Sequence, residues 1–388
     1  MTPPPSPPPG PPPSPPRALT IGDLAVSPPV VLAPMAGVTN APFRRLCRRH
    51  GAGLYVAEMI TARAYVEGNR KTMRLAGFDA DESPRSIQLY GIDAHHVGLA
   101  VARLVAEAGV DHIDLNFGCP APKVTRNGGG AALPVRRRLL AAIIRAAVHH
   151  AGDVPVTAKF RLGIDDDHLT FIETGRIAAD LGCAAIALHA RTAEQLYSGT
   201  ARWAAIGELK AAVPTVPVLG NGDIWDADDA LAMVAATGCD GVVVGRGCLG
   251  RPWLFGDLAN AFAGRTVAEP PTLGAVCDTM IEHLDLLCAW AGEHLGVREF
   301  RKHAGWYLKG YPVGGEIRRE LNQLTSREAL AERLAQFDRA AVMLPNGRRA
   351  KRGHQNGPRK VALPEHWFEA ADDDTALDAA AESATSGG

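Results

Sequence analysis

The chain has 388 residues, of which 46% are hydrophobic, and its 41 lysine and arginine residues nearly balance 42 aspartate and glutamate residues. This length and apolar content predict one large domain with a smaller one beside it. The 7 cysteines form no Cys-x-x-Cys pair, which argues against a disulfide framework and a zinc module, and no apolar run is long enough for a membrane span. We therefore expect a cytoplasmic protein with no metal site and no membrane partner.

A proline-rich arm precedes a long region of alternating strand-like and helical segments. Residues 1–17 are dominated by proline and predict a disordered, polyproline II-like arm without the features of a secretory signal. From about residue 30, apolar segments typical of strands alternate with helical ones. The predicted strands are 30–35, 54–59, 85–90, 112–117, 154–160, 184–190, 216–222 and 241–247. Such repeats predict a (β/α)8 TIM barrel over 18–262, with a doubly wound open sheet as the alternative.

The pattern changes after Arg251-Pro252. Residues 263–344 show helical periodicity without strand candidates, which predicts a small all-helical domain. Residues 345–388 form a tail that is basic, then acidic, and is expected to be largely extended. Residues 298–360 contain 15 lysines and arginines against 6 aspartates and glutamates. An excess of this kind is either a solvated helical face or a surface for a polyanion such as nucleic acid.

Polar residues recur at the ends of the predicted strands, where a TIM barrel places its active site. The segment Pro34-Met35-Ala36 follows the first strand, and the others are Gln88, Asn116, Lys159, Arg161, His189, Arg191, Asn221, Asp223 and Arg246. Glycine-rich turns follow the seventh and eighth strands, at Gly222 and at Gly245. Because such turns form the usual phosphate pocket of these barrels, they predict a phosphorylated ligand.

Three of these residues have other interpretations. Lys159 lies in an apolar strand and should face an anion or an electron-rich ring, with a Schiff base or a structural salt bridge as alternatives. His189 could be a hydrogen-bonded core histidine. Gln88 could bond neighbouring backbone, although an amide there would suit a ring with donors and acceptors.

Cys119 lies between Gly118 and Pro120, just beyond the fourth predicted strand. A free cysteine is usually a small buried hydrophobe, but this position at a strand end is a poor place for core packing. The flanking glycines and prolines predict an exposed, mobile loop on which the thiol can react.

Several segments resemble the tRNA-dihydrouridine synthases, and most closely the bacterial B-type enzymes. They are APMAGVTN (33–40), QLYG (88–91), DLNFGCPAPKV (114–124), KFRLG (159–163), HARTAEQLYSGTARW (189–203), NGDI (221–224) and FRKHAGWYLKGYPVGGEIRRELNQL (300–324). The resemblance covers nearly the whole barrel and continues into the helical domain. The proline-rich arm and the tail beyond about residue 340 fall outside it.

The resemblance implies an enzyme that uses FMN, with NADPH as reductant, to reduce a tRNA uridine to 5,6-dihydrouridine. Cys119 matches the catalytic cysteine, and a thiol with an ordinary pKa of ~8.5 is a suitable acid to protonate C5 after hydride reaches C6. The FMN contacts carry over onto Pro34, Met35, Ala36, Gln88, Lys159, His189, Asn221, Gly222, Asp223, Gly245 and Arg246.

The implied partner is tRNA, with a D-loop uridine as the target of a monomeric enzyme. Asn116 and Arg161 correspond to positions near the base. Phosphate contacts, which give affinity without reading sequence, are expected beside the site and along the helical domain, at Lys123, Arg126, Arg191, Arg301, Lys302 and Lys309. Two alternatives stay open: an FMN barrel acting on a free pyrimidine, like the dihydroorotate and dihydropyrimidine dehydrogenases, and a non-catalytic RNA-binding protein.

Overall fold

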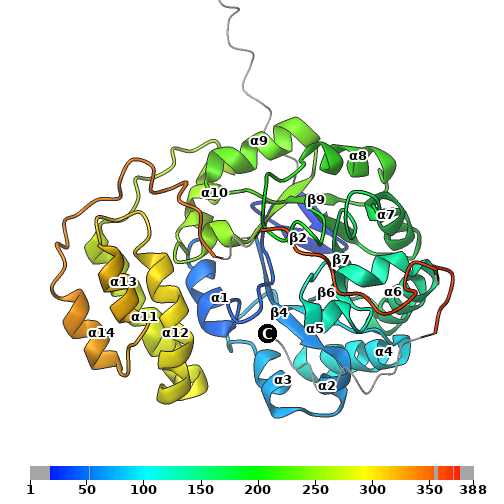
Figure 1. The fold of residues 1–388 in the computed structure, drawn as a ribbon, viewed down its shortest axis with the longest axis horizontal. Helices are drawn as coiled ribbons and strands as arrows, with labels where there is room; N and C mark the ends of the chain where they lie inside the picture. Colours follow the sequence, from blue (N-terminus) through cyan, green and yellow to red (C-terminus); the bar gives the residue numbers. More distant parts are fainter. Residues whose placement is uncertain (1–17, 52, 354–356, 370, 376–388) are drawn as a thin grey trace, which may run out of the picture.

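The computed structural model describes residues 18–51, 53–353, 357–369 and 371–375, so the proline-rich arm predicted over 1–17 lies outside it. Eight parallel strands close into a barrel in the order β10-β3-β4-β5-β6-β7-β8-β9 (Figure 1). They are β3 (Val30–Leu32), β4 (Leu54–Thr61), β5 (Ser86–Tyr90), β6 (His112–Phe117), β7 (Val156–Arg161), β8 (Ala185–His189), β9 (Val218–Asn221) and β10 (Gly241–Val244). The predicted TIM barrel is confirmed, and the open-sheet alternative is wrong.

Two strands, β3 and β10, end well before the apolar runs that predict them, whereas the other strand ends differ less. The run 30–35 is a strand only to Leu32, because Ala33 makes the last bond to Val244 (2.9 Å) and Pro34 has no N–H to continue the ladder. The run 241–247 ends at Val244, after which Arg246–Cys248 form a 3-10 turn. Both shortened ends become loops at the rim of the barrel, where a ligand can contact them.

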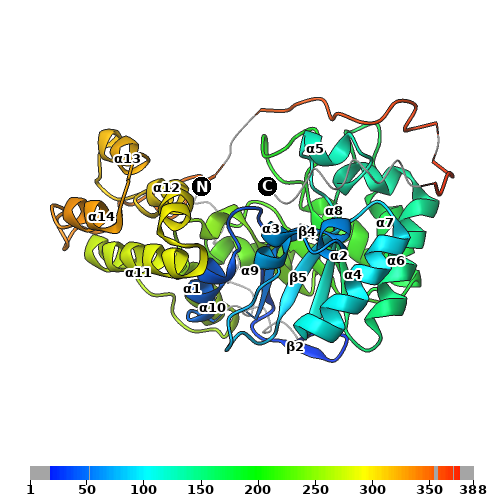
Figure 2. The same cartoon turned by 90° about the horizontal axis from the view of Figure 1, so that it is seen from below.

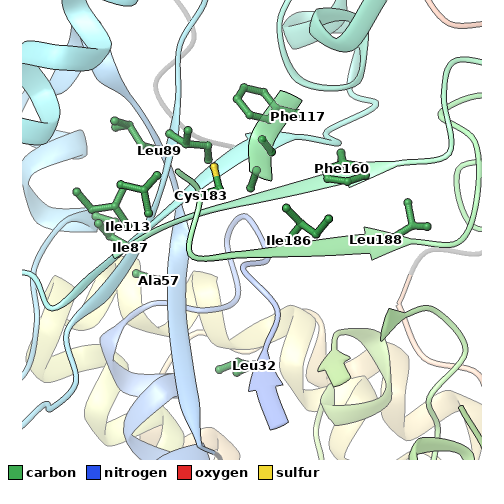
Figure 3. Packing of buried hydrophobic residues seen from close by; sticks show 14 of the residues in the cluster. Leu32, Ala57, Ile87, Leu89, Ile113, Phe117, Phe160, Cys183, Ile186 and Leu188 are labelled. Carbon is green, nitrogen blue, oxygen red and sulfur yellow. The ribbon is translucent and has the colours of Figure 1, made fainter. Parts of the chain in front are cut away.

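Helices surround the barrel, and most of them cover its outer face. They are α1 (Ala41–Arg48), α2 (Ala62–Val66), α3 (Arg70–Leu75), α4 (Ala94–Arg103), α5 (Pro122–Thr125), α6 (Arg137–Ala151), α7 (Phe171–Asp180), α8 (Ala204–Ala212), α9 (Ala227–Thr237) and α10 (Leu254–Phe262). In α6 the buried residues recur at helical spacing, at Leu140, Ile143, Ile144 and Ala147. They belong to the core in which Ile87, Ile113 and Ile186 project from the strands (Figure 3).

A short hairpin, absent from the predicted strands, closes the N-terminal end of the barrel. Its strands β1 (Leu19–Ile21) and β2 (Leu24–Val26) pair antiparallel. Leu19, Ile21 and Val26 pack against residues from inside the barrel, including Val31, Val56, Ala187, Leu219 and Val243. Figure 2 shows β2 at one end of the barrel and α5 at the other. Since strands of three residues carry almost no periodicity, the sequence pattern did not indicate them.

The remaining helices pack beside the barrel on their own core. They are α11 (Leu273–Ala291), α12 (Glu293–Tyr307), α13 (Gly315–Leu321) and α14 (Arg327–Leu334). The ring of Phe43 on α1 contacts His283 on α11 and His303 on α12, with centroids 5.7 and 5.8 Å away. Within the part of the chain that the structure describes, no helix is long and apolar enough to cross a membrane.

Candidate functional site

A pocket of about 770 Å³ opens at the C-terminal ends of the strands. Parallel strands bring their carboxyl ends to one rim, so residues distant in sequence converge there. Of the predicted site residues, the pocket is lined by Pro34, Met35, Ala36, Gln88, Asn116, Cys119, Lys159, Arg161, His189, Asn221, Gly222, Asp223, Gly245, Arg246 and Lys302. Three aromatic residues of this lining were not predicted: Tyr197, Trp225 and Trp306. Tyr197 lies inside a segment that carried the family resemblance, which was the available signal.

The loop that carries Cys119 is held by hydrogen bonds at both ends. Asn116 Oδ1 accepts the backbone N–H groups of Gly118 (3.1 Å) and Cys119 (2.9 Å). The Cys119 carbonyl accepts the N–H of Ala131 (3.0 Å), and a Cβ on Gly130 would lie 2.5 Å from that carbonyl oxygen. The thiol is partly buried rather than fully exposed as expected. The loop therefore presents the thiol from a defined position.

Asn116 is itself positioned by a chain of polar side chains inside the barrel. Its Nδ2 donates to Gln88 Oε1 (2.7 Å), and Gln88 Nε2 donates to Asp114 Oδ2 (2.7 Å). Thr157 donates to Asp114 Oδ1 (2.6 Å), and His112 Nε2 lies 3.0 Å from Thr157 Oγ1. Burial raises the pKa of Asp114 and lowers that of His112 to about 3, so His112 is neutral. The network fixes both amide orientations beneath the thiol.

Lys159 and His189 give one wall of the pocket its polarity. Lys159 Nζ donates to Asn221 Oδ1 (3.0 Å), and Asn221 Nδ2 donates to the carbonyl of Val243 (2.7 Å). Burial and the nearby Arg161 lower the pKa of Lys159. Burial, assisted by Arg161 and Lys159, lowers the pKa of His189 well below its ordinary value, so its ring is neutral. This wall offers hydrogen-bond donors and a positive charge to the polar edge of a ring.

Arg161 connects the cysteine loop to the loop after β8. Its guanidinium donates to the carbonyls of Gly118, Thr192 and Leu196, each at 2.9 Å. Only 4% of the residue is exposed. Its contacts therefore hold two loops of the pocket together, although it also lines the cavity where a base was expected.

Arg191 does not occupy the tRNA-contacting place expected for it. It is 1% exposed, and its Nη2 donates to both carboxylate oxygens of Asp223 at 2.8 and 2.7 Å. Asp223 also accepts the N–H of Ala201 (2.8 Å) and has a φ of +55°. The ion pair with Arg191 balances the charge of this carboxylate and fixes the turn after β9.

The two glycine-rich turns, after β9 and β10, form one end of the pocket. Gly222 has a φ of +127°, and a Cβ there would lie 2.8 Å from Ala201 Cβ, so this turn requires glycine. Arg246 stacks over Tyr197, with its guanidinium carbon 4.2 Å from the ring centroid, and burial lowers its pKa to about 10. Arg246 thus remains protonated at neutral pH. A close backbone approach and one positioned cation fit a phosphate group.

The other predicted tRNA contacts lie outside the pocket or at its edge. Lys123 and Arg126 are exposed on or beside α5, next to the cysteine loop. Arg301 donates from Nε to the carbonyl of Leu324 (2.8 Å), which ties α12 to the chain beyond α13. Lys302 pairs with Glu299 and lines the pocket. Lys309 is half-buried, and its pKa is lowered by burial and by Arg352.

The parallel barrel and the electropositive pocket with its thiol define an enzyme of the TIM-barrel class. The fold resembles that of histamine dehydrogenase from Rhizobium sp. 4-9, with a TM-score of 0.51 and 14% identity. That match covers 83% of this chain and 64% of the other, which is less than two thirds of the other's length. At this identity the likeness shows the fold alone.

The chain belongs to the dihydrouridine synthase family, whose model matches residues 31–342, and it is therefore an oxidoreductase. It is 54% identical to a probable tRNA-dihydrouridine synthase of Mycobacterium tuberculosis over 366 residues, 92% of this chain and 94% of that protein. It is 43% identical to tRNA-dihydrouridine synthase B of Xanthomonas campestris pv. campestris over 311 residues, 80% and 93% of the two chains. The family indicated by the sequence motifs is confirmed.

Proposed function

We propose that this protein reduces a uridine of tRNA to 5,6-dihydrouridine, with FMN as the bound cofactor and NADPH as the reductant. The observation that carries the proposal is that the Cys119 thiol lines the same pocket as two glycine-rich turns with Arg246 and a wall rich in hydrogen-bond donors. Membership of the family, and relatives that are named as tRNA-dihydrouridine synthases, support the reaction and the substrate.

FMN would lie along the pocket. Pro34, Met35 and Ala36 would contact its ring, while Gln88, Lys159 and His189 would face the polar edge. The phosphate would be held by the turns after β9 and β10, through Asn221, Gly222, Asp223, Gly245 and Arg246. When bound and reduced, FMN supplies the hydride that C6 of uracil accepts.

Cys119 then protonates C5. Hydride addition at C6 leaves negative charge on C5 and O4, which a neutral acid must quench. Burial raises the pKa of the Cys119 thiol, so it carries its proton at neutral pH. Asn116 holds the backbone of the cysteine loop, and Arg161 braces it from the other side through Gly118. Both residues thereby position the acid, and their side chains lie where the base would enter.

The tRNA would lie across the rim of the barrel and the helical domain. Lys123 and Arg126 flank the cysteine loop, and Lys302 extends the cationic rim toward α12. The target base, proposed to be a D-loop uridine, must leave its stack to reach a pocket inside the barrel. Arg301 and Lys309 would support this surface through α12, and the enzyme would act as a monomer in the cytoplasm.

The activity is tested with tRNA lacking dihydrouridine, incubated with the FMN-loaded protein and NADPH and then digested to nucleosides for mass spectrometry. A gain of two hydrogen atoms on uridine is expected. If the protein reduces free uracil or oxidises dihydroorotate but does not reduce uridine in tRNA, the free-pyrimidine alternative is favoured. Tight tRNA binding with bound flavin but no reduction would favour a non-catalytic RNA-binding protein.

The rate of uridine reduction is expected to fall only at alkaline pH. The acid is active in its protonated form, and burial raises its pKa, so the active form persists above the ordinary thiol pKa of ~8.5 and is lost as pH rises through the raised value. Single-turnover rates measured from about pH 6 to about pH 10 show where the rate falls at alkaline pH. FMN occupancy is followed in parallel as the control, and a rate that already declines below the ordinary thiol pKa at constant occupancy contradicts the assignment.

Charge reversal at Lys302 is expected to weaken tRNA binding and leave FMN content intact. Lys302 lines the pocket and pairs with the Glu299 side chain. Among the residues that the structure describes, it bonds no backbone carbonyl, whereas Arg301 bonds that of Leu324. Lys302→Glu should reduce the dependence of log affinity on log salt by about one unit or more. Arg145→Glu, on the exposed face of α6, is the matched control. Equal affinity and slope for both variants would remove Lys302 from the tRNA surface.

A further inference from the structure

The C-terminal tail returns from the helical domain and crosses the mouth of the pocket. In Figures 1 and 2 its red segment runs over the end of the barrel that carries α5. Arg359, Lys360, Val361 and Ala362 line the same pocket as Cys119. This segment lies outside residues 31–342, which the family model matches. The match to the mycobacterial relative covers 92% of the chain and so extends beyond residue 342.

A tryptophan anchors the far end of this segment on the barrel. Trp367 is 2% exposed, and its Nε1 donates to the carbonyl of Ala132 (2.9 Å). The Arg136 guanidinium lies 4.2 Å from the ring centroid. The slot is shaped by Gly128, where a Cβ would lie 2.3 Å from the indole ring. The indole ring is buried in a complementary slot and its N–H is hydrogen-bonded, so Trp367 makes a specific contact with the barrel. A loosely packed, solvated tail would not make such a contact.

Further contacts fix the tail on both sides of the pocket. Beyond the tryptophan, Arg136 pairs with Asp373 (2.8 Å). Above the pocket, the N–H of Arg359 donates to the carbonyl of Glu194 (2.9 Å). On the side of the helical domain, Arg352 is fully buried and its Nη2 donates to the carbonyl of Lys309 (2.7 Å). The described segment 357–369 is therefore held at a set place on the rim.

The two cations of the segment are available to a ligand. Arg359 and Lys360 are both exposed, and among the residues placed by the structure neither takes part in an ion pair. They lie on a pocket whose lining also includes Arg246 and Lys302. Two unneutralised charges at the entrance repel each other, and an anionic partner that spans them relieves this cost.

We propose that Arg359 and Lys360 bind the phosphates next to the target uridine, which makes the tail a second tRNA-binding element of this enzyme. The inference rests on the proposed function, because a base that enters the pocket from tRNA brings its flanking phosphates to the rim. The helical domain reaches the pocket through Lys302, and the tail adds two further cations at the same rim. Trp367 is a positioning residue that keeps the two cations in place.

The test compares the double variant Arg359→Ala/Lys360→Ala with the control Arg145→Ala/Arg176→Ala, whose residues are exposed on α6 and α7. Affinity of the FMN-loaded proteins for unmodified tRNA is measured over a range of salt concentrations. Loss of two phosphate contacts should weaken binding roughly tenfold to thirtyfold near physiological salt and lower the salt slope by about two, with an unchanged control. The single-turnover rate at saturating tRNA is measured on the same variants and should not exceed that of the unaltered protein.

Three results would overturn the proposal. The first is a tRNA affinity and a salt slope of the double variant that equal those of the control. The second is tighter tRNA binding by the double variant, and the third is a faster single-turnover rate. Either of the last two would mean that the tail obstructs the pocket. Trp367→Ala, with folding checked by thermal unfolding, should weaken tRNA binding in the same direction, and unaltered binding would contradict its positioning role. Absence of dihydrouridine with every protein would reject the proposed function separately, since the binding measurement does not depend on turnover.

Discussion

Replacing Cys119 with alanine is expected to lower the rate of dihydrouridine formation by about a hundredfold to ten-thousandfold, which is the usual contribution of a positioned general acid. Alanine has no proton to deliver to C5, and the partly buried position limits replacement of the thiol by a freely exchanging water. The measurement is a single turnover of reduced, FMN-loaded enzyme with tRNA, quantified by mass spectrometry of nucleosides.

The matched control is Cys288→Ala. Cys288 is also partly buried, but it lies on α11 in the helical domain and is absent from the pocket lining. FMN content and tRNA affinity should be unchanged in both variants, because the backbone bonds from Asn116 to the cysteine loop do not involve the thiol. A Cys119→Ala enzyme that retains the rate of the control would assign the proton to another group.

Replacing Arg191 with methionine is expected to reduce both stability and FMN affinity. The carboxylate of Asp223 would lose its bidentate partner, and removing one member of a buried ion pair typically costs about 3–5 kcal/mol. The upper part of this range does not apply, since Asp223 keeps the N–H of Ala201 and is 18% exposed in its side chain. The unpaired negative charge of Asp223 would also remain 3.8 Å from Arg246, at the end of the pocket where we propose that the FMN phosphate binds.

Urea unfolding of the FMN-free protein measures the change in stability, and titration with FMN measures the affinity. The double variant Arg191→Met/Asp223→Asn is the control, because it removes the uncompensated charge as well as its partner. It should recover part of both losses. If the double variant is as impaired as the sum of its single changes, the ion pair does not account for the effect.

The barrel could be predicted because its signal is local and repeated. Each strand of β5 to β8 is an apolar run flanked by helical sequence, and β6 spans the predicted residues 112–117. Cys119 was likewise identifiable from its neighbours, since a cysteine between glycine and proline at a strand end is poor core material. The resemblance to the family then supplied the reaction in which we propose that this thiol acts.

Side-chain partners were not predictable from the same patterns. Arg161 and Arg191 both looked like ligand-binding cations at strand ends, yet one binds three backbone carbonyls and the other a carboxylate. The partners of Arg161 come from loops separated from it by 31 to 43 residues, and a pattern along the chain does not say which groups meet. Arginine has five N–H donors, and when the side chain is buried these donors must find acceptors among whichever groups the fold brings near them.

The sequence by itself determined the barrel, the helical domain and the family, and it singled out Cys119 as the candidate acid, because periodicity and motifs are properties of neighbouring residues. Only the tertiary structure decided that the tail lies across the pocket. The tail has no periodicity, and its position depends on the slot that Gly128 and Ala132 offer to Trp367 across 235 residues of chain. Such a contact follows from the shape of the folded surface, which exists only after the barrel has formed.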